Sequence, residues 1–383
     1  PEYRYSVRYG TPRTCYTEES TTMRLREESN CDNEAAKPEL DHLRTDRERT
    51  GQASTTVEDG SDRLVSFIIA TYNRPNDLSE AVASILRQEY RPIEIHIVSN
   101  STDDTAELFE AGGRFDEECV HYHEFPGRMG VPQARNVGYD LASGDILVTV
   151  DDDAVLLNDD AATEVVRLFE ANPDVGVLAF QCRNYYTGEV NDHETPDPPS
   201  FEMSPRESYR ATNFVGVGNA IRRDAIERAG AFPDDFVYGF EEMDLSLRVH
   251  DTGYDIIYTP TIVVGHKKSP EGRRTDTETL ERFVENRIRI AVRNLPLRYV
   301  LFTSLIWGMY GALAIRKADS LRRIAGRLVA DRDALLAERS VVDPAVIDRI
   351  KGRKTMLYRW WYGPHPGRIL GRKGNPRRLF WEL

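Results

Sequence analysis

The strongest constraint on the fold is an alternation of short apolar runs with helical segments in the first half of the chain. Residues 64–70 and 146–150 are almost continuously apolar, which is typical of strands buried on both faces of a sheet. Between these runs, apolar residues recur at helical spacing over 78–86, and a second strand is predicted at 93–98. Strands that alternate with helices favour βαβ units, so the sequence predicts an α/β domain with a mostly parallel sheet flanked by helices.

The same periodicities predict the other elements and the limits of the domain. Further helices are expected at about 103–111, 131–142 and 223–229, and further strands near 120–124, 175–180 and 214–221. A Pro-rich loop over 195–205 is a candidate mobile lid. Residues 1–62 are polar and aperiodic, so we expect a disordered leader. The α/β domain should then occupy 63–270, and 271–383 should form a helical, basic C-terminal extension.

Charge is distributed unevenly along the chain and bears on its partners. The net charge is −13, yet residues 316–383 hold 17 Lys and Arg against 7 Asp and Glu. An acidic body disfavours nucleic acid as a partner, because duplexes bind by phosphate neutralisation. The basic tail suits either an anionic membrane surface or solvent. Four widely spaced cysteines and an N-terminus without an apolar core segment predict a cytoplasmic protein.

One apolar segment leaves the relation to a membrane open. Residues 299–315 are uncharged and lie between Arg298 and Arg316. Their length is at the short limit for a membrane span, which needs roughly 17–25 residues. The segment is therefore interpreted as a buried helix, an interfacial helix or a true span. An interfacial helix would place the protein at the cytoplasmic face of the membrane.

Three consecutive acids, Asp151, Asp152 and Asp153, directly follow the predicted strand 146–150. In α/β sheets, ligands bind beyond the carboxyl ends of the strands, which is where these side chains fall. Adjacent carboxylates repel one another unless a cation or solvent compensates them. Hard cations such as Mg²⁺ and Mn²⁺ prefer oxygen ligands and often share them with a substrate phosphate. The triplet predicts a metal site, with an acidic surface turn as the alternative.

A second acidic group, Glu241, Glu242 and Asp244, opens a predicted helix. Acids in a first helical turn are favoured by the helix dipole, so capping is one interpretation. Three acids within four positions exceed what a cap needs, and a carboxylate can act as a general base. Neighbouring helical residues point about 100° apart, so at most one of Glu241 and Glu242 faces a reacting centre.

Two further residues have side chains suited to a metal-diphosphate site. His266 ends an apolar stretch, and its imidazole would be a fitting third ligand for Mn²⁺. Arg135 begins the predicted helix ahead of the aspartates, and a guanidinium matches phosphate in a bidentate manner. A structural histidine and a solvent-facing arginine, with Asn136 capping locally, are the alternatives.

Six stretches together form a recognisable pattern. Residues 65–258 resemble a family 2 glycosyltransferase of the GT-A fold, similar to rhamnosyltransferase-like and archaeal N-glycosylation enzymes. The stretches occur in the order and spacing of that family, and they are VSFIIATYNRP, STDDT, GVPQARNVG, SGDILVTVDDD, GVGNAIRRDAIERAGAFPDDF and GFEEMDLSLRVHDTGYDIIYTP. The resemblance implies a Rossmann-like GT-A domain that transfers sugar from a nucleotide-diphosphate sugar with inversion.

The resemblance also implies roles for individual residues. The DxD-type motif would be Asp151–Asp153, binding Mg²⁺ or Mn²⁺ through Asp151 and Asp153 with His266, while Asp152 contacts the donor. Glu242 matches the catalytic base, with Glu241 and Asp244 as the other catalytic candidates. The remaining donor-binding candidates are Thr71, Tyr72, Asn73, Arg74, Arg135, Asn136, Ser99 and Asn100.

Two departures from the family pattern affect specificity. Ser99 and Asn100 follow the second strand where the family usually has Asp, so the nucleotide base is left open. The usual Glu-Asp pair is Glu241-Glu242, which keeps the acid but lengthens it by one methylene group. The acceptor would be a glycan or a polyprenyl-linked molecule in lipid-linked or cell-surface glycan assembly. A polyprenyl-phosphate sugar synthase, a sugar nucleotidyltransferase and an inactive sugar-nucleotide-binding protein are the alternatives.

Overall fold

A computed structural model describes residues 63–127, 129–197, 204–269 and 276–351. All of these belong to one compact unit of the chain. The predicted leader over 1–62 and part of the predicted lid, 198–203, lie outside the described residues, as does the basic segment 352–383.

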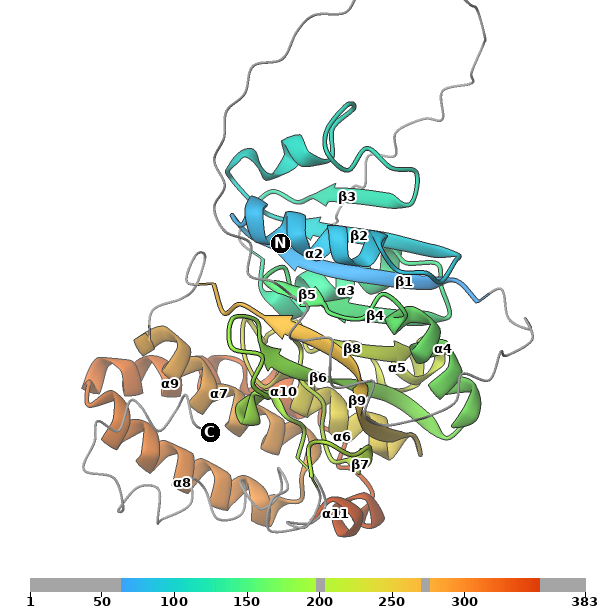
Figure 1. Ribbon diagram of the computed structural model, residues 1–383. Helices are drawn as coiled ribbons and strands as arrows, with labels where there is room; N and C mark the ends of the chain where they lie inside the picture. The colour runs from blue at the N-terminus through green and yellow to red at the C-terminus, as the bar shows by residue number, and fades with distance from the viewer. Residues whose placement is uncertain (1–62, 128, 198–203, 270–275, 352–383) are drawn as a thin grey trace, which may run out of the picture. The chain divides into compact units, whose positions relative to one another are not determined.

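Within the described residues, a nine-stranded sheet forms the centre of the α/β domain (Figure 1). Its strands β3, β2, β1 and β4 run parallel, while β8 is antiparallel to both β4 and β6, and β6 runs parallel to β9. The α/β class is confirmed, and the expected parallel order holds up to β4, beyond which the sheet is mixed. Across the sheet the strands are β3 (Val120–Glu124), β2 (Ile93–Ser99), β1 (Val65–Thr71), β4 (Ile146–Val150), β8 (Gly218–Arg222), β6 (Val175–Asn184), β9 (Asp255–His266) and β5 (Ala154–Leu156), with β7 (Tyr209–Ala211) also paired to β9.

Helices cover both faces of this sheet, and each face has its own apolar cluster. On one face, α2 (Pro75–Leu86) and α4 (Ala161–Ala171) share an apolar cluster with alternate residues of β1 and β2, and α4 itself lies against β6 and β9. On the other face lie α3 (Val131–Leu141), α5 (Arg223–Ala229) and α6 (Glu241–Asp251). Two-sided coverage explains why β1 and β4 read as continuous apolar runs.

Two predicted elements differ in the structure. The helix expected over 103–111 is only a 3₁₀ turn, η1 (Asp104–Leu108), in which the Asp103 carboxylate accepts a bond from Thr105 N. Such side chains bond the nearby backbone and compete with helix formation. The strand expected from 214 begins at Gly218, because the preceding segment passes beside the side chains of Arg135 and Glu242 instead of pairing with β4.

The C-terminal region is helical over its described part. It consists of α7 (Asp276–Asn294), α8 (Leu297–Ile315), α9 (Ala318–Ala330), α10 (Arg332–Ala337) and α11 (Pro344–Ile350). In the described chain, α8 is the one helix long and apolar enough to cross a membrane, and 39% of its apolar window is buried. Trp307 and Tyr310 pack in a cluster with Val284 of α7, whereas Leu301 and Leu305 are exposed. The helix is thus half covered by protein.

Candidate active site

Several of the predicted site residues, among them the three aspartates and His266, lie where β4 ends, beside the ends of β1 and β9. The short strand β5 returns antiparallel to β9, with Ala154 opposite His266. This register places Asp153 next to His266, and Lys267 N donates a hydrogen bond to Asp153 O at 3.0 Å. Strand pairing therefore joins two segments that are far apart in the sequence.

The three aspartates have different environments. Asp152 accepts hydrogen bonds from Thr71 Oγ1 at 2.9 Å and from Arg74 at 2.7 Å. Burial, together with the neighbouring carboxylates, outweighs Arg74 and raises the pKa of Asp152 to about 6. Asp151 instead pairs with Arg135 at 2.8 Å. Asp152 thus anchors the loop after β1, while Asp151 points toward the helix α3.

Asp153 and His266 form the second half of the cluster. His266 Nε2 lies 3.2 Å from Asp153 Oδ1, and His266 Nδ1 lies 2.9 Å from Glu194 Oε1. Burial opposes a charged imidazole, but the hydrogen bonds to both carboxylates outweigh it and raise the pKa of His266 to about 9. The same contacts outweigh the burial of Glu194 and lower its pKa to about 2.

Glu194 is a site residue that the sequence interpretation missed. It lies on the 3₁₀ turn η2 (Asp192–Glu194) and also accepts hydrogen bonds from Asn191 and from Cys182 Sγ. Lys268 Nζ lies 3.3 Å away. No apolar periodicity surrounds this turn, so the sequence offered no signal that placed the residue beside His266.

The residues present fit a divalent cation. Asp151, Asp153 and His266 each offer one ligand atom, and these atoms lie within 4.8 Å of one another. Acids outnumber guanidinium groups here, since Asp151, Asp152, Asp153, Glu241 and Glu242 share those of Arg74 and Arg135. Two carboxylates with one imidazole suit Mg²⁺ less well than Mn²⁺, which accepts nitrogen ligands more readily.

Arg135 connects the aspartates to the glutamate pair. Its side chain is 4% exposed, and it contacts Asp151 at 2.8 Å, Glu242 at 3.2 Å and Glu241 at 3.4 Å. Gly216 makes this possible, because a Cβ atom there would lie 2.1 Å from Glu242 Oε1. The guanidinium predicted to meet a diphosphate is therefore enclosed by three carboxylates in this structure.

The two glutamates differ in their access to solvent. They open α6 behind Phe240, whose φ of 69° places it in the left-handed region. Burial and neighbouring negative charges raise the pKa of Glu241, and burial likewise raises that of Glu242 in spite of Arg135. The Glu242 side chain is 16% exposed against 4% for Glu241. Glu242 is the member of the pair that a substrate can reach more easily.

Asp244, the third acid of this motif, is not brought to the cluster. Its carboxylate is fully buried, with Arg248 at 2.7 Å and Asn294 Nδ2 at 2.6 Å. Asn294 is the last residue of α7, so Asp244 joins α6 to the C-terminal helices. These contacts are sufficient to explain an acidic residue at position 244, so we infer no catalytic role for Asp244.

The donor-binding candidates lie together in part. Asn73 N donates to Ser101 Oγ, and Asn73 Oδ1 accepts from Thr102 N, both at 2.8 Å. These bonds hold the loop after β1 against the loop after β2, where Ser99 Oγ accepts from Ser101 N. Tyr72 is exposed beside them.

The other two candidates contact backbone atoms. Asn100 donates to Gly127 O at 3.1 Å. Asn136 donates to Phe232 O and accepts from Phe232 N, so its amide holds a loop and is not part of the acidic cluster. The structure thus gathers the residues at the ends of β1 and β2, but it directs Asn136 elsewhere.

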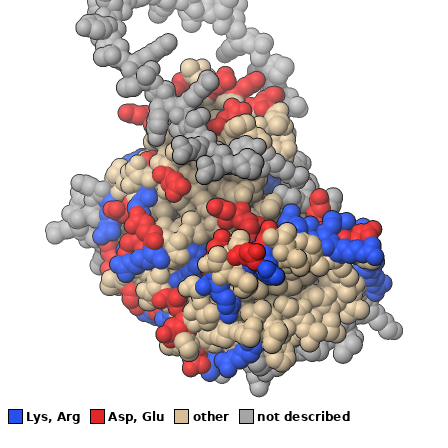
Figure 2. Space-filling model, turned by 180° about the vertical axis from the view of Figure 1, so that it is seen from behind, with Lys and Arg blue, Asp and Glu red and all other residues tan. Residues whose placement is uncertain are grey.

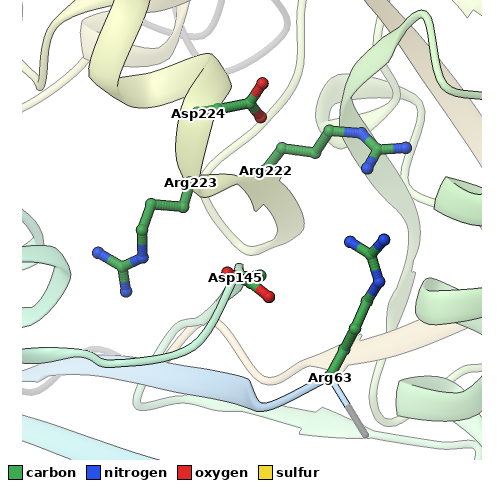
Figure 3. A pocket seen from close by; sticks show the side chains of 5 residues that line it. All are labelled: Arg63, Asp145, Arg222, Arg223 and Asp224. Atoms are coloured by element: carbon green, nitrogen blue, oxygen red, sulfur yellow. The ribbon is translucent and has the colours of Figure 1, made fainter. Parts of the chain in front are cut away.

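A separate hollow lies at the opposite ends of β1 and β4 (Figure 3). It is lined by Arg63, Asp145, Arg222, Arg223 and Asp224. Arg222 and Arg223 donate to backbone carbonyls, including those of Val175 and Gly144. Arg222 and Arg223 therefore stabilise the backbone around this hollow. None of the predicted site residues lines it.

Together, the mixed sheet, the aspartates at the end of β4 and the acids opening α6 define a glycosyltransferase of the GT-A fold. Residues 66–230 match the family model described as glycosyl transferase family 2. This part of the chain is therefore a family 2 glycosyltransferase domain.

Two relatives illustrate the similarity in sequence. A poly-beta-1,6-N-acetyl-D-glucosamine synthase of Staphylococcus epidermidis is 25% identical over 51% of this chain and 48% of its own length. A glucosyl-dolichyl phosphate glucuronosyltransferase of Haloferax volcanii is 26% identical over 53% of this chain and 69% of its own. The chain spans about half the length of the synthase.

Solved structures share the fold. The structure of GalNAc-T7 with UDP, GalNAc and Mn²⁺ has a TM-score of 0.53 and 17% identity, covering 72% of this chain and 58% of that one. TarS 1-349 of S. aureus in complex with UDP has a TM-score of 0.51 and 16% identity, covering 78% and 87%. At this identity the likeness confirms the GT-A architecture.

Proposed function

We propose that the protein transfers a sugar, with inversion, from a nucleotide-diphosphate sugar to an acceptor hydroxyl in the assembly of a lipid-linked or cell-surface glycan. The observation that carries this proposal is the single cluster in which Arg135 joins Asp151 to Glu242. Asp151 and Arg135, which could hold a metal-diphosphate, therefore lie beside Glu242, a carboxylate that a substrate can reach. An acceptor placed between them would meet both the leaving group and a base.

The metal part of the proposal rests on the ligand set. Asp151, Asp153 and His266 would hold Mn²⁺ or Mg²⁺, and Glu194 would orient the imidazole from the far side. A bound divalent cation would supply charge neutralisation for the departing diphosphate. The GalNAc-T7 structure, which holds UDP and Mn²⁺, supports this proposal by the likeness of fold.

The base in this proposal is Glu242. The ionised carboxylate accepts the proton of the acceptor hydroxyl, and a lone pair of that oxygen forms a bond to the anomeric carbon. The nucleoside diphosphate leaves with the electron pair of the broken bond between the anomeric carbon and its oxygen. Attack and departure on opposite sides of one carbon invert its configuration. Glu241 is less exposed and would position Arg135.

The acceptor part of the proposal rests on α8. Five of its exposed apolar residues recur every fourth position and so lie along one side of the helix: Leu297, Leu301, Leu305, Met309 and Leu313. Figure 2 shows a broad area without charged side chains on the side of the molecule where α8 lies, with Lys and Arg at its border. We propose contact with the cytoplasmic face of an anionic membrane, where a polyprenyl-linked acceptor would be held.

Donor binding and turnover test this function directly. The full chain would be screened with UDP-, GDP- and dTDP-sugars in the presence of Mn²⁺, by thermal shift and by release of nucleoside diphosphate. We expect one nucleotide to stabilise the protein only with Mn²⁺, and Asp153→Ala to abolish that shift. Asp319→Ala, at an exposed ion pair on α9, is the matched control and should leave it unchanged.

Each other outcome has a defined meaning. Full transfer activity in EDTA would contradict the metal site. Donor binding without any turnover over a broad acceptor panel would favour the inactive binding protein. Transfer to a polyprenyl phosphate in place of a hydroxyl would favour the polyprenyl-phosphate sugar synthase.

A further inference from the structure

A second cluster of metal-ligand side chains lies on strands β2 and β3, in residues that the proposed reaction does not use. Glu94 and His96 lie on β2, and His121 and His123 lie on β3, which ends the sheet. The strands are parallel, with His96 opposite His121. Because side chains alternate between faces along a strand, all four project from the same face. This is the α3 face, since Glu94 contacts residues 143 and 144 after that helix.

The spacing of these groups matches a metal site. Glu94, His96 and His121 each offer one ligand atom, and the three atoms lie within 4.8 Å of one another. The ring of His96 stacks on that of His121 with centroids 5.0 Å apart, and on that of His123 at 5.3 Å. Three imidazoles are thus packed beside one carboxylate.

The atoms of His96 show which nitrogen is available. Nδ1 lies 3.1 Å from His123 Nε2, so one hydrogen bond occupies that side of the ring. Nε2 is buried without a hydrogen bond, although it lies 3.4 Å from Glu94 Oε2. If Nδ1 carries the proton and donates it to His123, then Nε2 presents a lone pair toward a carboxylate oxygen. Two such atoms facing each other are stabilised by a cation between them.

Glu94 is held rigidly for this purpose. Its Oε1 accepts hydrogen bonds from Ser66 Oγ at 2.6 Å and from Gly144 N at 3.2 Å. These bonds favour the ionised carboxylate and lower the pKa of Glu94 in spite of burial. The other oxygen, Oε2, remains directed at His96. The carboxylate is therefore oriented before any ligand arrives.

We propose that Glu94, His96 and His121 bind a borderline divalent metal ion of the Zn²⁺ type, with His123 as the outer partner that orients His96. Imidazole with a single carboxylate is a ligand set for Zn²⁺, whereas Mg²⁺ prefers oxygen ligands throughout. The hydrogen bond from a ligating histidine to a second group is the usual means of fixing its ring. The ion would tie the terminal strand β3 to β2 and stabilise that end of the sheet.

Spectroscopy on the full-length protein tests this site. After removal of metal with a chelator, Co²⁺ would be titrated and then displaced with Zn²⁺. We expect one of the bound Co²⁺ ions to show the visible absorption of a nitrogen and oxygen tetrahedral site. We also expect Zn²⁺ to raise the melting temperature, because a ligand that binds only the folded state stabilises it.

The variants decide whether these residues are responsible. His121→Ala, at a half-buried position, should weaken Co²⁺ binding by about 10–100-fold or more, and His123→Ala should weaken it by about 10-fold. His193→Ala, at an exposed histidine on η2, and Asp153→Ala, in the proposed donor site, are the controls and should bind Co²⁺ at this site as before. Their behaviour separates this site from the proposed transferase activity.

Two results would overturn the proposal. One is that Co²⁺ uptake and the Zn²⁺-dependent melting shift are the same in His121→Ala as in the unaltered chain. The other is a thiolate charge-transfer band on Co²⁺ that survives His121→Ala, which would assign the ion to the cluster of Cys182, Glu194 and His266. Circular dichroism on His121→Ala would confirm that its sheet is intact.

Discussion

The hydrogen bonds of Arg135 determine how the two acidic motifs act together. A buried guanidinium between Asp151 and Glu242 offsets the repulsion between these two carboxylates. Removing one partner of such a group leaves a charge that is buried and unpaired. The arginine is thus a positioning residue for both motifs.

The base assignment leads to a prediction at this scale. Glu242→Gln should lower turnover by about 10²–10⁴-fold, because a positioned base typically contributes that factor. Donor affinity should hardly change, since the proposed donor site lies on the aspartates and the loop after β1. The measurements are kcat for transfer and Kd for the donor with Mn²⁺.

Glu241→Gln is the matched comparison on the adjacent residue of α6. It should reduce turnover less than Glu242→Gln and affect stability more, because Glu241 is the more buried of the two. Near-normal turnover in Glu242→Gln with loss of turnover in Glu241→Gln would reverse the assignment.

Helix α8 packs against the protein along only part of its surface. One side is covered by α7 and α9, where Trp307 and Tyr310 are buried. Its opposite side exposes a row of large apolar residues, and such patches in water-facing proteins commonly mark an interaction surface. A membrane interface would cover this row while leaving the basic residues beyond Arg316 in contact with lipid headgroups.

This arrangement predicts a loss of vesicle binding on substitution. Leu301→Glu combined with Leu305→Glu should weaken binding to anionic vesicles by at least 10–100-fold, since burying one Leu side chain contributes about 1.5–3 kcal/mol. Val329→Glu combined with Leu336→Glu alters equally exposed apolar residues on α9 and α10 and should have little effect. Sedimentation with vesicles measures both. Equal binding by the two double variants would rule out α8 as the contact.

In the molecule as a whole, the C-terminal helices are joined to the α/β domain by polar contacts, several of them buried. Arg289 and Arg293 of α7 pair with Asp235, and Asn294 bonds Asp244. On α11, Arg349 donates to His250 O at 2.9 Å and pairs with Asp255 at 3.0 Å. These contacts connect the helices to α6 and β9, so unfolding of one part should disturb the other.

The contact around His250 predicts acid sensitivity. Burial, with the charge of Arg349, lowers the pKa of His250 from 6.5 to about 4. Between these values the unfolded chain binds more protons than the folded one. The contribution of His250 to stability is therefore fully present above about pH 6.5 and is lost as the pH is lowered toward 4, by at most about 3 kcal/mol.

Urea unfolding at several pH values between 7 and 5 measures this effect. His250→Gln should show a shallower fall of the free energy of unfolding with pH than the unaltered chain. A slope from His123 should remain, because burial also lowers its pKa to about 4. An identical pH dependence in both proteins would contradict the assignment to His250.

The sequence by itself determined the α/β class, the succession of β1 to β4 along the chain, and the position of the acids after β4 and at the start of α6. Each of these follows from local periodicity or from adjacency along the chain. The strand-end rule then predicted that Asp151 and Asp153 lie at the carboxyl edge of the sheet, which is where they are found.

Only the tertiary structure decided which of these groups meet. The register of β5 against β9 brings His266 to Asp153, and the turn at η2 adds Glu194. The tertiary structure also surrounds Arg135 with carboxylates, and it places Asp244 in contact with Asn294 of α7, away from the cluster. These partners lie tens to more than a hundred residues apart, and pairing at such separation depends on strand register and helix packing. The physical reason is that local periodicity specifies an element, whereas side-chain contacts depend on how the elements pack against one another.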